Sequence, residues 1–301
     1  MSKDENSKSP FHGLWALTNR ELKKLYKNPI LLFMTVIQPL IWLGLFGKAL
    51  NLAQIFTGGS VSIPSSALQG LNSTQITEVQ KALSSLGTAV LVKTFGTTSY
   101  FSFLSVGMIS FIVLFTCMFS GMSIVWDRRL GILNKLLSTP VSRGSILMSK
   151  VFNSVIRSLL QAVIVLIIAF ALGLQVGPSF SILSLFGVFF VVFLLCMGLS
   201  SIFIMIAIRS TDWQTQMAVM NLLNLPLLFA SNALFPTSIM PSWLRAVANV
   251  NPISYATDAS RQLMLYQTNI SKLIFDFAYL GAFAIIFSLI GILLSWRYLS
   301  K

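Results

Sequence analysis

Apolar residues in this chain gather in long runs that short polar segments separate. Each run is about as long as a helix that crosses a bilayer, which needs roughly 20 residues. The runs predict transmembrane helices at 29–50, 102–126, 151–172, 182–207, 216–235 and 272–296. The pattern therefore predicts an all-α, polytopic membrane protein with six transmembrane helices, which places both chain ends on the same side.

Basic residues are divided unequally between the two sides that these windows define. Fifteen of the 21 Lys and Arg residues fall on the side of the chain ends and of the loop 127–150. Because positively charged loops are retained in the cytoplasm, we expect both termini to be cytoplasmic and the protein to lie in the cell membrane.

Composition agrees with a membrane location. The chain is 55% hydrophobic with a mean hydropathy of +0.81, which is more apolar surface than one soluble core of this length could hide. Its net charge of +13 is carried by segments that flank the apolar runs. These basic residues therefore predict contacts with anionic lipid headgroups, and nucleic acid is the poorer explanation.

The segment 1–28 is predicted to be a cytoplasmic head with an amphipathic helix lying at the membrane interface. Phe11, Leu14, Trp15, Leu22, Leu25 and Tyr26 share one side of the helical wheel, and Arg20, Lys23, Lys24 and Lys27 occupy the other. Such segregation is typical of interfacial helices. A basic retention signal without a helix is the simpler alternative.

Residues 29–301 are predicted to form one transmembrane domain with two external segments. The external loop 51–101 contains a helical pattern that opens at Ser73. The external region 236–271 contains Pro236, Pro241 and Pro252, which forbid one continuous helix. We expect short helices there, at the outer headgroup layer or dipping below it. Asn72 and Asn269 match the glycosylation acceptor pattern, which chance often produces, and they are assigned no role.

The cytoplasmic loop 127–150 predicts a short amphipathic helix that stops before Pro140. Leu130, Leu133, Leu136 and Leu137 recur at helical spacing, among five basic residues and one acid. This helix could lie on the membrane surface or dock a cytoplasmic partner, and composition does not choose between these two interpretations.

Polar residues inside the apolar runs indicate faces that meet protein or water. In the fifth window, a stripe of four polar side chains marks a possible translocation path: Asn221, Asn224, Ser231 and Asn232. Hydrogen bonding between helices and contact between two membrane subunits are the alternatives. Thr116, Ser120 and Ser123 share a narrower face that favours close helix packing.

No catalytic or metal-binding constellation is apparent. The eight acids are not paired at spacings suited to acid–base chemistry, His12 is the one histidine, and Asp276 is a single carboxylate near the external end of the last window. Cys117 and Cys196 lie in apolar runs, where we expect small hydrophobes rather than a disulfide or a metal site. The chain is therefore expected to be no enzyme and to bind no metal or cofactor itself.

Two segments resemble the permease subunits of ABC-2 type transporters. RLGILNKLLSTPVSRGSILMSK is similar to the family's loop between the second and third spans, although Ile132 and Asn134 stand where glutamate and threonine are common. MPSWLRAVANVNPISYATDASR is similar to the signature before the last span, at Pro241, Trp243, Leu244, Asn251, Pro252, Tyr255, Asp258 and Arg261. Span number and order extend the likeness over nearly the whole chain.

The resemblance implies a permease subunit of an exporter for a substrate such as a drug, lipid or glycan. It implies a second permease, identical or related, and two cytoplasmic ATPase subunits that bind ATP and Mg, since this sequence contains no GxxxxGK[ST] phosphate loop. It further implies that the N-terminal helix and the loop 127–150 contact the ATPases, and that 236–265 re-enters the membrane from outside. The residues expected to couple to the ATPase are Arg128, Arg129, Leu133, Lys135, Leu136, Leu137 and Pro140.

Three questions stay open at this stage. No residue discriminates among drug, lipid and glycan substrates, and the pairing with an identical or a related permease is undecided. An ion-coupled carrier or channel that acts without an ATPase is the alternative function. It would require ionisable groups within the spans, where Arg157 and Asp276 are the main candidates.

Overall fold

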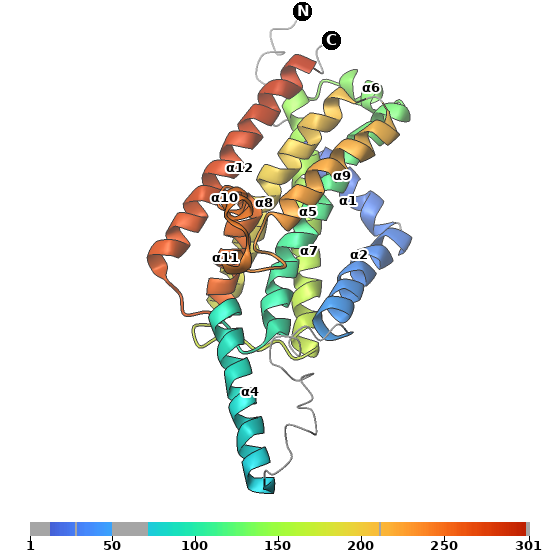
Figure 1. Ribbon diagram of the computed structural model, residues 1–301. Coiled ribbons are helices and arrows are strands. Elements are labelled where there is room, and N and C mark those ends of the chain that lie inside the picture. The colour runs from blue at the N-terminus through green and yellow to red at the C-terminus, as the bar shows by residue number, and fades with distance from the viewer. Residues whose placement is uncertain (1–12, 28, 50–71, 211, 299–301) are drawn as a thin grey trace, which may run out of the picture.

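The computed structural model describes residues 13–27, 29–49, 72–210 and 212–298, and every regular element in these ranges is helical (Figure 1). The elements are α1 (Leu14–Tyr26), α2 (Pro29–Trp42), η1 (Leu43–Ala49), α4 (Ser73–Phe95), α5 (Tyr100–Arg129), α6 (Ile132–Leu137), α7 (Arg143–Ala171), α8 (Ile182–Arg209), α9 (Trp213–Phe229), η3 (Thr237–Ile239), α10 (Ser242–Ala248), α11 (Pro252–Met264) and α12 (Ile270–Tyr298). The predicted all-α class is confirmed.

Four helical stretches are long and apolar enough to cross a membrane. They are Thr74–Arg129, which joins α4 to α5, and Arg143–Ala171, Ile182–Arg209 and Ile270–Arg297. These stretches contain the predicted windows 102–126, 182–207 and 272–296, and all of 151–172 except its last residue. The chain is therefore a multi-pass membrane protein. The remaining windows, 29–50 and 216–235, fall on shorter helices, so the predicted count of six remains a prediction.

The first window is helical throughout its described part, but the type of helix changes along it. Pro39 lies inside α2, where it removes one backbone donor and crowds the preceding turn. The helix continues as the π-helical segment η1 from Leu43 to Ala49. A wider helical turn therefore follows the helix that contains Pro39.

The fifth window is not one helix to residue 235, because α9 ends at Phe229. Pro226 lies in its last turn, and the Asn251 side-chain amide donates to the carbonyl oxygens of Leu227 and Ala230, each at 2.7 Å. These contacts satisfy carbonyls that a continuing helix would have bonded. Ser231 and Asn232 therefore lie beyond α9, and the predicted four-residue stripe does not follow one helix.

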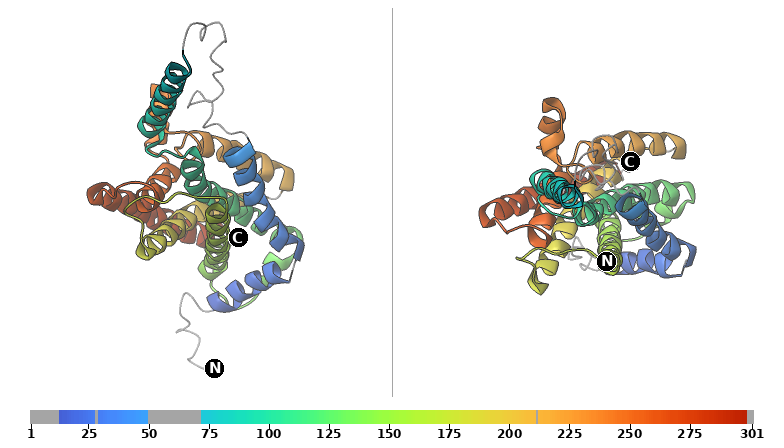
Figure 2. Two further views of the ribbon diagram at one scale, coloured as in Figure 1. Left: turned by 90° about the horizontal axis from the view of Figure 1, so that it is seen from below. Right: turned by 60° about the horizontal axis from the view of Figure 1, so that its bottom comes forward.

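The bundle is organised around α5, which is buried along nearly its whole length. It contacts α7, α8, α9 and α11, while α12 packs against α8, α7 and α11 (Figures 1 and 2). Gly121 allows the closest approach of α5 to α8, since a Cβ at this position would lie 2.7 Å from the Phe203 carbonyl oxygen. Serine N-caps start three of the long helices: Ser99 before α5, Ser142 before α7 and Ser181 before α8.

Loop boundaries differ from the prediction at the α6 end of the bundle. The short helix before Pro140 is confirmed as α6, but α5 extends to Arg129 and α7 already begins at Arg143. The irregular part of 127–150 is correspondingly short. Polar residues such as Ser145 and Lys150 lowered the hydropathy of 143–150, yet both are buried against the bundle. Hydropathy alone therefore placed the start of this helix too late.

The opposite end of the bundle carries α4, which projects away from the other helices (Figure 1). It begins at Ser73, as the pattern predicts, and ends at Gly96, whose φ of 69° is the left-handed conformation that glycine adopts readily. α10 and α11 confirm the prediction of short helices in 236–271. The last residues of α12 lie at the end where α6 lies, away from α4 (Figure 1).

Candidate functional site

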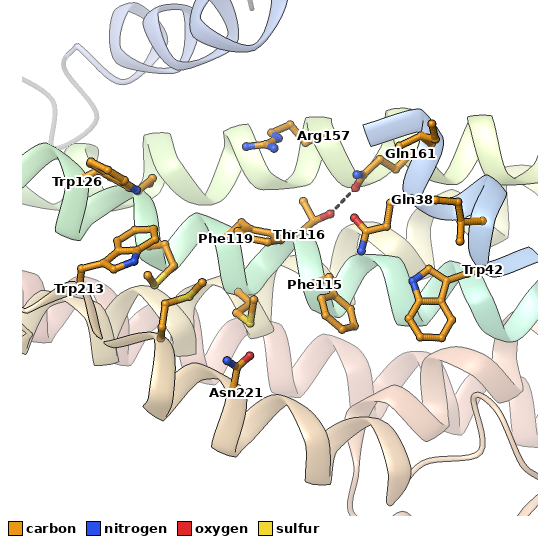
Figure 3. Close-up of a pocket in the computed structure, with 16 residues that line it drawn as sticks. Gln38, Trp42, Phe115, Thr116, Phe119, Trp126, Arg157, Gln161, Trp213 and Asn221 are labelled. Carbon is orange, nitrogen blue, oxygen red and sulfur yellow. Dashed lines mark hydrogen bonds between the residues drawn. The ribbon is translucent and has the colours of Figure 1, made fainter. Parts of the chain in front are cut away.

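A cavity of about 780 Å³ lies between α2, α5, α7 and α9 (Figure 3). Its volume is in the range of small-molecule sites. Residues from Phe115 to Trp126 of α5 form one wall, a rise of about 16 Å along the helix. The wall at the α6 end includes Trp126 and Trp213, whose ring centroids lie 4.7 Å apart.

Polar side chains from all four helices face this mainly apolar cavity. They are Gln38, Thr116, Ser123, Arg157, Gln161 and Asn221. Thr116 donates its hydroxyl hydrogen bond to the side-chain oxygen of Gln161, which joins α5 to α7 (Figure 3). Asn221 is the one residue of the predicted translocation stripe that lines the cavity. It lies on α9, opposite Arg157 and Gln161 of α7 in Figure 3.

The other members of the predicted stripe have different environments. Asn224 is 2% exposed, and its side-chain oxygen has no hydrogen-bond partner among the described residues. The Ser231 hydroxyl donates to the Leu228 carbonyl at 2.6 Å, and Asn232 donates to Asp258 at 2.8 Å. One of the four predicted stripe residues therefore lines the cavity. The other three belong to α9 or to the segment that follows it.

Five charged side chains form a network between α1, α5 and α7 beside this cavity. They are Arg20, Glu21, Lys24, Asp127 and Lys150. The Lys150 ammonium lies 2.6 Å from the Asp127 carboxylate and 3.7 Å from that of Glu21. Lys24 contacts the same two acids at 3.3 and 3.0 Å. The network holds α1 against α5 and α7, two of the helices that line the cavity.

Sequence reasoning missed the three innermost members of this network. Glu21, Asp127 and Lys150 are between 2% and 8% exposed. A signal was available, because Asp127 is the one acid in the basic segment 127–150, and Glu21 is the one acid in 13–28. A carboxylate isolated among cations near a membrane surface indicates a pairing site.

The predicted helix of the N-terminal head forms as α1, and it packs against the bundle through residues that the prediction did not name. Leu17, Thr18 and Glu21 are buried, and α1 packs against α7. Trp15 is 74% exposed, as an aromatic side chain that meets lipid would be, and Lys23 and Lys27 are exposed too. The side chain of Tyr26 lies outside the described residues, as does all of Phe11.

The predicted coupling residues divide into exposed and structural groups. Arg129, Lys135 and Pro140 are exposed, whereas Leu133 is buried and Leu136 and Leu137 are half-buried. Arg128 donates to the carbonyl oxygens of Ile208 and Ser210 at 2.6 and 2.9 Å, and so caps the end of α8. The surface that a partner could reach at this end is therefore basic through Arg129 and Lys135.

The predicted signature residues build the support of the broken region 230–265. Arg261 is 1% exposed, and its guanidinium donates to the carbonyl oxygens of Phe103, Asn232 and Ala233 at 3.1, 2.7 and 2.9 Å. It also lies 3.4 Å from the Phe103 ring centroid. A Cβ on Gly107 would lie 2.0 Å from the Ala233 oxygen, so only glycine permits this approach.

The remaining signature residues fix α10 and α11. Pro241 and Pro252 precede or start these helices, and Asn251 caps α11 by accepting from the Ile253 N–H at 3.0 Å. Asp258 accepts from Lys272 at 2.7 Å, and Tyr255 stacks on Tyr279 with centroids 3.9 Å apart. Leu244 is half-buried, while Trp243 is 68% exposed on α10.

Two further groups are brought together that the sequence did not pair. Gln262 donates to Asp276 at 3.0 Å, which ties α11 to α12. The sulfur atoms of Cys117 and Cys196 lie 3.4 Å apart where α5 meets α8, and both thiols are free and buried. Within the described residues, no three His, Cys, Asp or Glu side chains are grouped so as to hold a metal ion.

Residues 12–265 match the family described as ABC-2 type transporter. A protein named transport permease ycf38 from Cyanophora paradoxa is 30% identical over 297 residues, which cover 96% of this chain and 89% of that protein. The protein of the same name from Porphyra purpurea is 30% identical over 82% of this chain and 72% of its own length. The daunorubicin resistance ABC transporter permease protein DrrB1 of Streptomyces coeruleorubidus is 24% identical over 56% of this chain and 59% of its own.

Proposed function

This chain belongs to the ABC-2 type transporter family and is a transport permease, and we propose that it is the membrane subunit of an exporter driven by separate ATPase subunits. We propose six spans, with α2–η1 and α9 completing the four long helices, and with both chain ends on the cytoplasmic side of the cell membrane. α10 and α11 then enter the outer half of the membrane, where α5, α8 and α12 pack against α11.

The charge network between α1, α5 and α7 carries this proposal. It connects a surface helix to α5 and α7, the two cavity helices that a hydrogen bond between Thr116 and Gln161 joins. A partner that moves α1 and α6 would thereby move the cavity walls. ATP binding to such a partner would favour one arrangement of the walls over the other, since a ligand shifts an equilibrium by its differential affinity for the two states.

The cavity is the proposed substrate path. It is partly open and has polar groups from four helices among mainly apolar walls. We propose that its open side lies between α2 and α9. A second permease subunit, identical or related, facing this side would complete the enclosure, with Asn221 of α9 at the joint.

Charge reversal at the exposed coupling residues tests the ATPase partnership. The double variant Arg129→Glu with Lys135→Glu should lose roughly tenfold of any co-purified ATPase and of its ATP hydrolysis, because like charges facing each other across an interface oppose docking. Arg128 is unsuited to this test, since its loss would free the end of α8. Co-purification from the native membrane and hydrolysis per permease are the measurements.

The matched control is Lys81→Glu on α4, at the opposite end of the bundle, which should leave both quantities unchanged. Equal ATPase retention in the double variant and the control would refute docking at α6. Ion flux in liposomes that contain this chain alone would instead support the ion-coupled alternative.

A further inference from the structure

Arg157 stands apart from the other cations at the α6 end of the bundle. It projects from α7 into the 780 Å³ cavity, and it also lines a second cavity of about 300 Å³ that the charge network borders (Figure 3). Its Nε atom is buried without a hydrogen-bond partner, and no carboxylate among the described residues lies within ion-pair distance of its guanidinium. A cation held this way in a membrane protein is costly without an anion.

The ionisable side chains around the two cavities carry a net positive charge. Among the described residues that line the larger cavity, Arg157 alone is ionisable. In the neighbouring network, the two carboxylates of Glu21 and Asp127 are contacted by the three cations Arg20, Lys24 and Lys150, which leaves one positive charge in excess. The two neighbouring cavities, both of which Arg157 lines, therefore favour a ligand with negative charge.

The shape of the larger cavity restricts the ligand further. Its α5 wall rises about 16 Å from Trp126 to Phe115, which is close to half of the ~30 Å hydrocarbon core of a bilayer. Beyond Arg157, the walls are mainly aromatic and aliphatic, with Phe115, Phe119 and Trp42 among them. The stretch of wall beyond Arg157 is shorter than this rise, because Arg157 lies between the Trp126 end and the Trp42 end of the cavity (Figure 3). The space therefore fits an acidic group at the level of Arg157 and the first part of an apolar tail.

We propose that the cavity binds an amphiphile that has an acidic headgroup and an apolar tail, with Arg157 as the headgroup partner. The inference deepens the proposed function by naming the substrate class, which sequence alone left open among drugs, lipids and glycans. Cationic amphiphiles and uncharged glycans fit this charge and these walls poorly.

Tryptophan fluorescence of the purified full-length chain in nanodiscs provides the test. Trp42, Trp126 and Trp213 line the cavity, so a lipid with brominated chains that enters it quenches their emission. Brominated phosphatidylglycerol should quench more than brominated phosphatidylcholine at equal mole fraction. Arg157→Gln should weaken the apparent affinity for phosphatidylglycerol roughly tenfold, because it removes a charge-assisted hydrogen bond. Arg157→Lys, which keeps the charge, should retain most of the preference.

Two control variants test whether the excess quenching comes from lipid bound in the cavity. Arg129→Gln removes an exposed cation at the same end and should leave the lipid preference intact. Trp126→Phe with Trp213→Phe should remove most of the excess quenching, even if an Arg157 variant fails to fold. Equal quenching by the two lipids, or an excess that survives Arg157→Gln, would overturn the proposal.

Other occupants give different results. Displacement of the brominated lipid by inorganic phosphate alone would show a free-anion site, and stronger quenching by a brominated cationic amphiphile would show the opposite charge preference. Disulfide-linked dimers of an Asn221→Cys variant without any excess quenching would show that a second copy fills the groove. Each of these results contradicts the proposal. The quenching assay needs neither an ATPase nor transport. Its result therefore tests lipid binding even if the proposed ATPase partnership is wrong.

Discussion

Lys150 and Arg261 are both almost fully buried cations, but they are neutralised in different ways. Lys150 contacts the side chains of Asp127, Glu21 and Ser123, which belong to α1 and α5. Arg261 contacts backbone carbonyls of α5 and of the turn after α9, together with the face of Phe103. One cation joins separate elements, and the other completes the backbone of an irregular segment.

The difference follows from where each cation lies. After α9 ends at Phe229, the carbonyls of Asn232 and Ala233 have no helical partner, and buried backbone in a membrane protein must be satisfied internally. The planar guanidinium of Arg261 presents several donors at once, which a single ammonium cannot do. The Lys150 network contains exposed members, Arg20 and Lys24, whose partners can change. We therefore expect the contacts of Arg261 to be fixed and the contacts of Lys150 to be able to rearrange.

Removing Arg261 should give the largest loss of stability. Arg261→Met leaves three buried carbonyls without their donor, so we expect unfolding to become easier by about 3 kcal/mol or more. Arg261→Lys should be intermediate, because its ammonium cannot span the same carbonyls. Tryptophan-monitored unfolding in mixed micelles measures both effects.

Arg245 provides the matched control, because its guanidinium also donates to three backbone carbonyls, those of Thr237, Ser238 and Met240, but is exposed. Water can replace these contacts, so Arg245→Met should cost less than about 1 kcal/mol. Similar losses for the two variants would show that burial of the carbonyls is not what makes Arg261 important.

The Lys150 site should show a smaller loss that a second substitution partly restores. Lys150→Met leaves the Asp127 carboxylate with the weaker contacts to Lys24 and Arg20, and we expect a cost of about 2 kcal/mol. Combining it with Asp127→Asn removes the unpaired charge, so the double variant should be more stable than the sum of the single losses predicts, by about 1 kcal/mol or more. A full double-mutant cycle on unfolding measures this coupling, and strict additivity would contradict a direct ion pair.

The regions around Lys150 and Arg261 are not equally predictable from the sequence. The helix α6 and its stop before Pro140 followed from leucine spacing, and four spans followed from hydropathy, because both are local properties. The charge network required three elements to meet, and Glu21, Asp127 and Lys150 are far apart in the chain. The apolar run 216–235 concealed the end of α9, since the residue that caps it, Asn251, comes 22 residues after Phe229. Local pattern thus predicted the elements, and tertiary contacts decided where they end.

Asp212 extends the comparison to an exposed carboxylate and should give the smallest effect. Its side chain caps α9 by accepting hydrogen bonds from the Thr215 N–H and the Thr215 hydroxyl, each at 2.8 Å. These hydrogen bonds, first that of the N–H and then that of the hydroxyl, lower the pKa of Asp212 below its ordinary value. A carboxyl whose folded-state pKa is lowered stabilises the fold above its unfolded-state pKa, and this contribution disappears as the pH falls through the folded-state value.

An Asp212→Asn variant keeps a capping oxygen that does not titrate. The difference in melting temperature between the chain and this variant should therefore be greatest near pH 7 and should shrink below about pH 4. Paired melts across this range cancel the other pH-dependent contributions to stability, which both proteins share. A difference that stays constant with pH would mean that the charge of Asp212 contributes nothing to the cap, and that carboxylates stabilise this fold only where it buries them against cations.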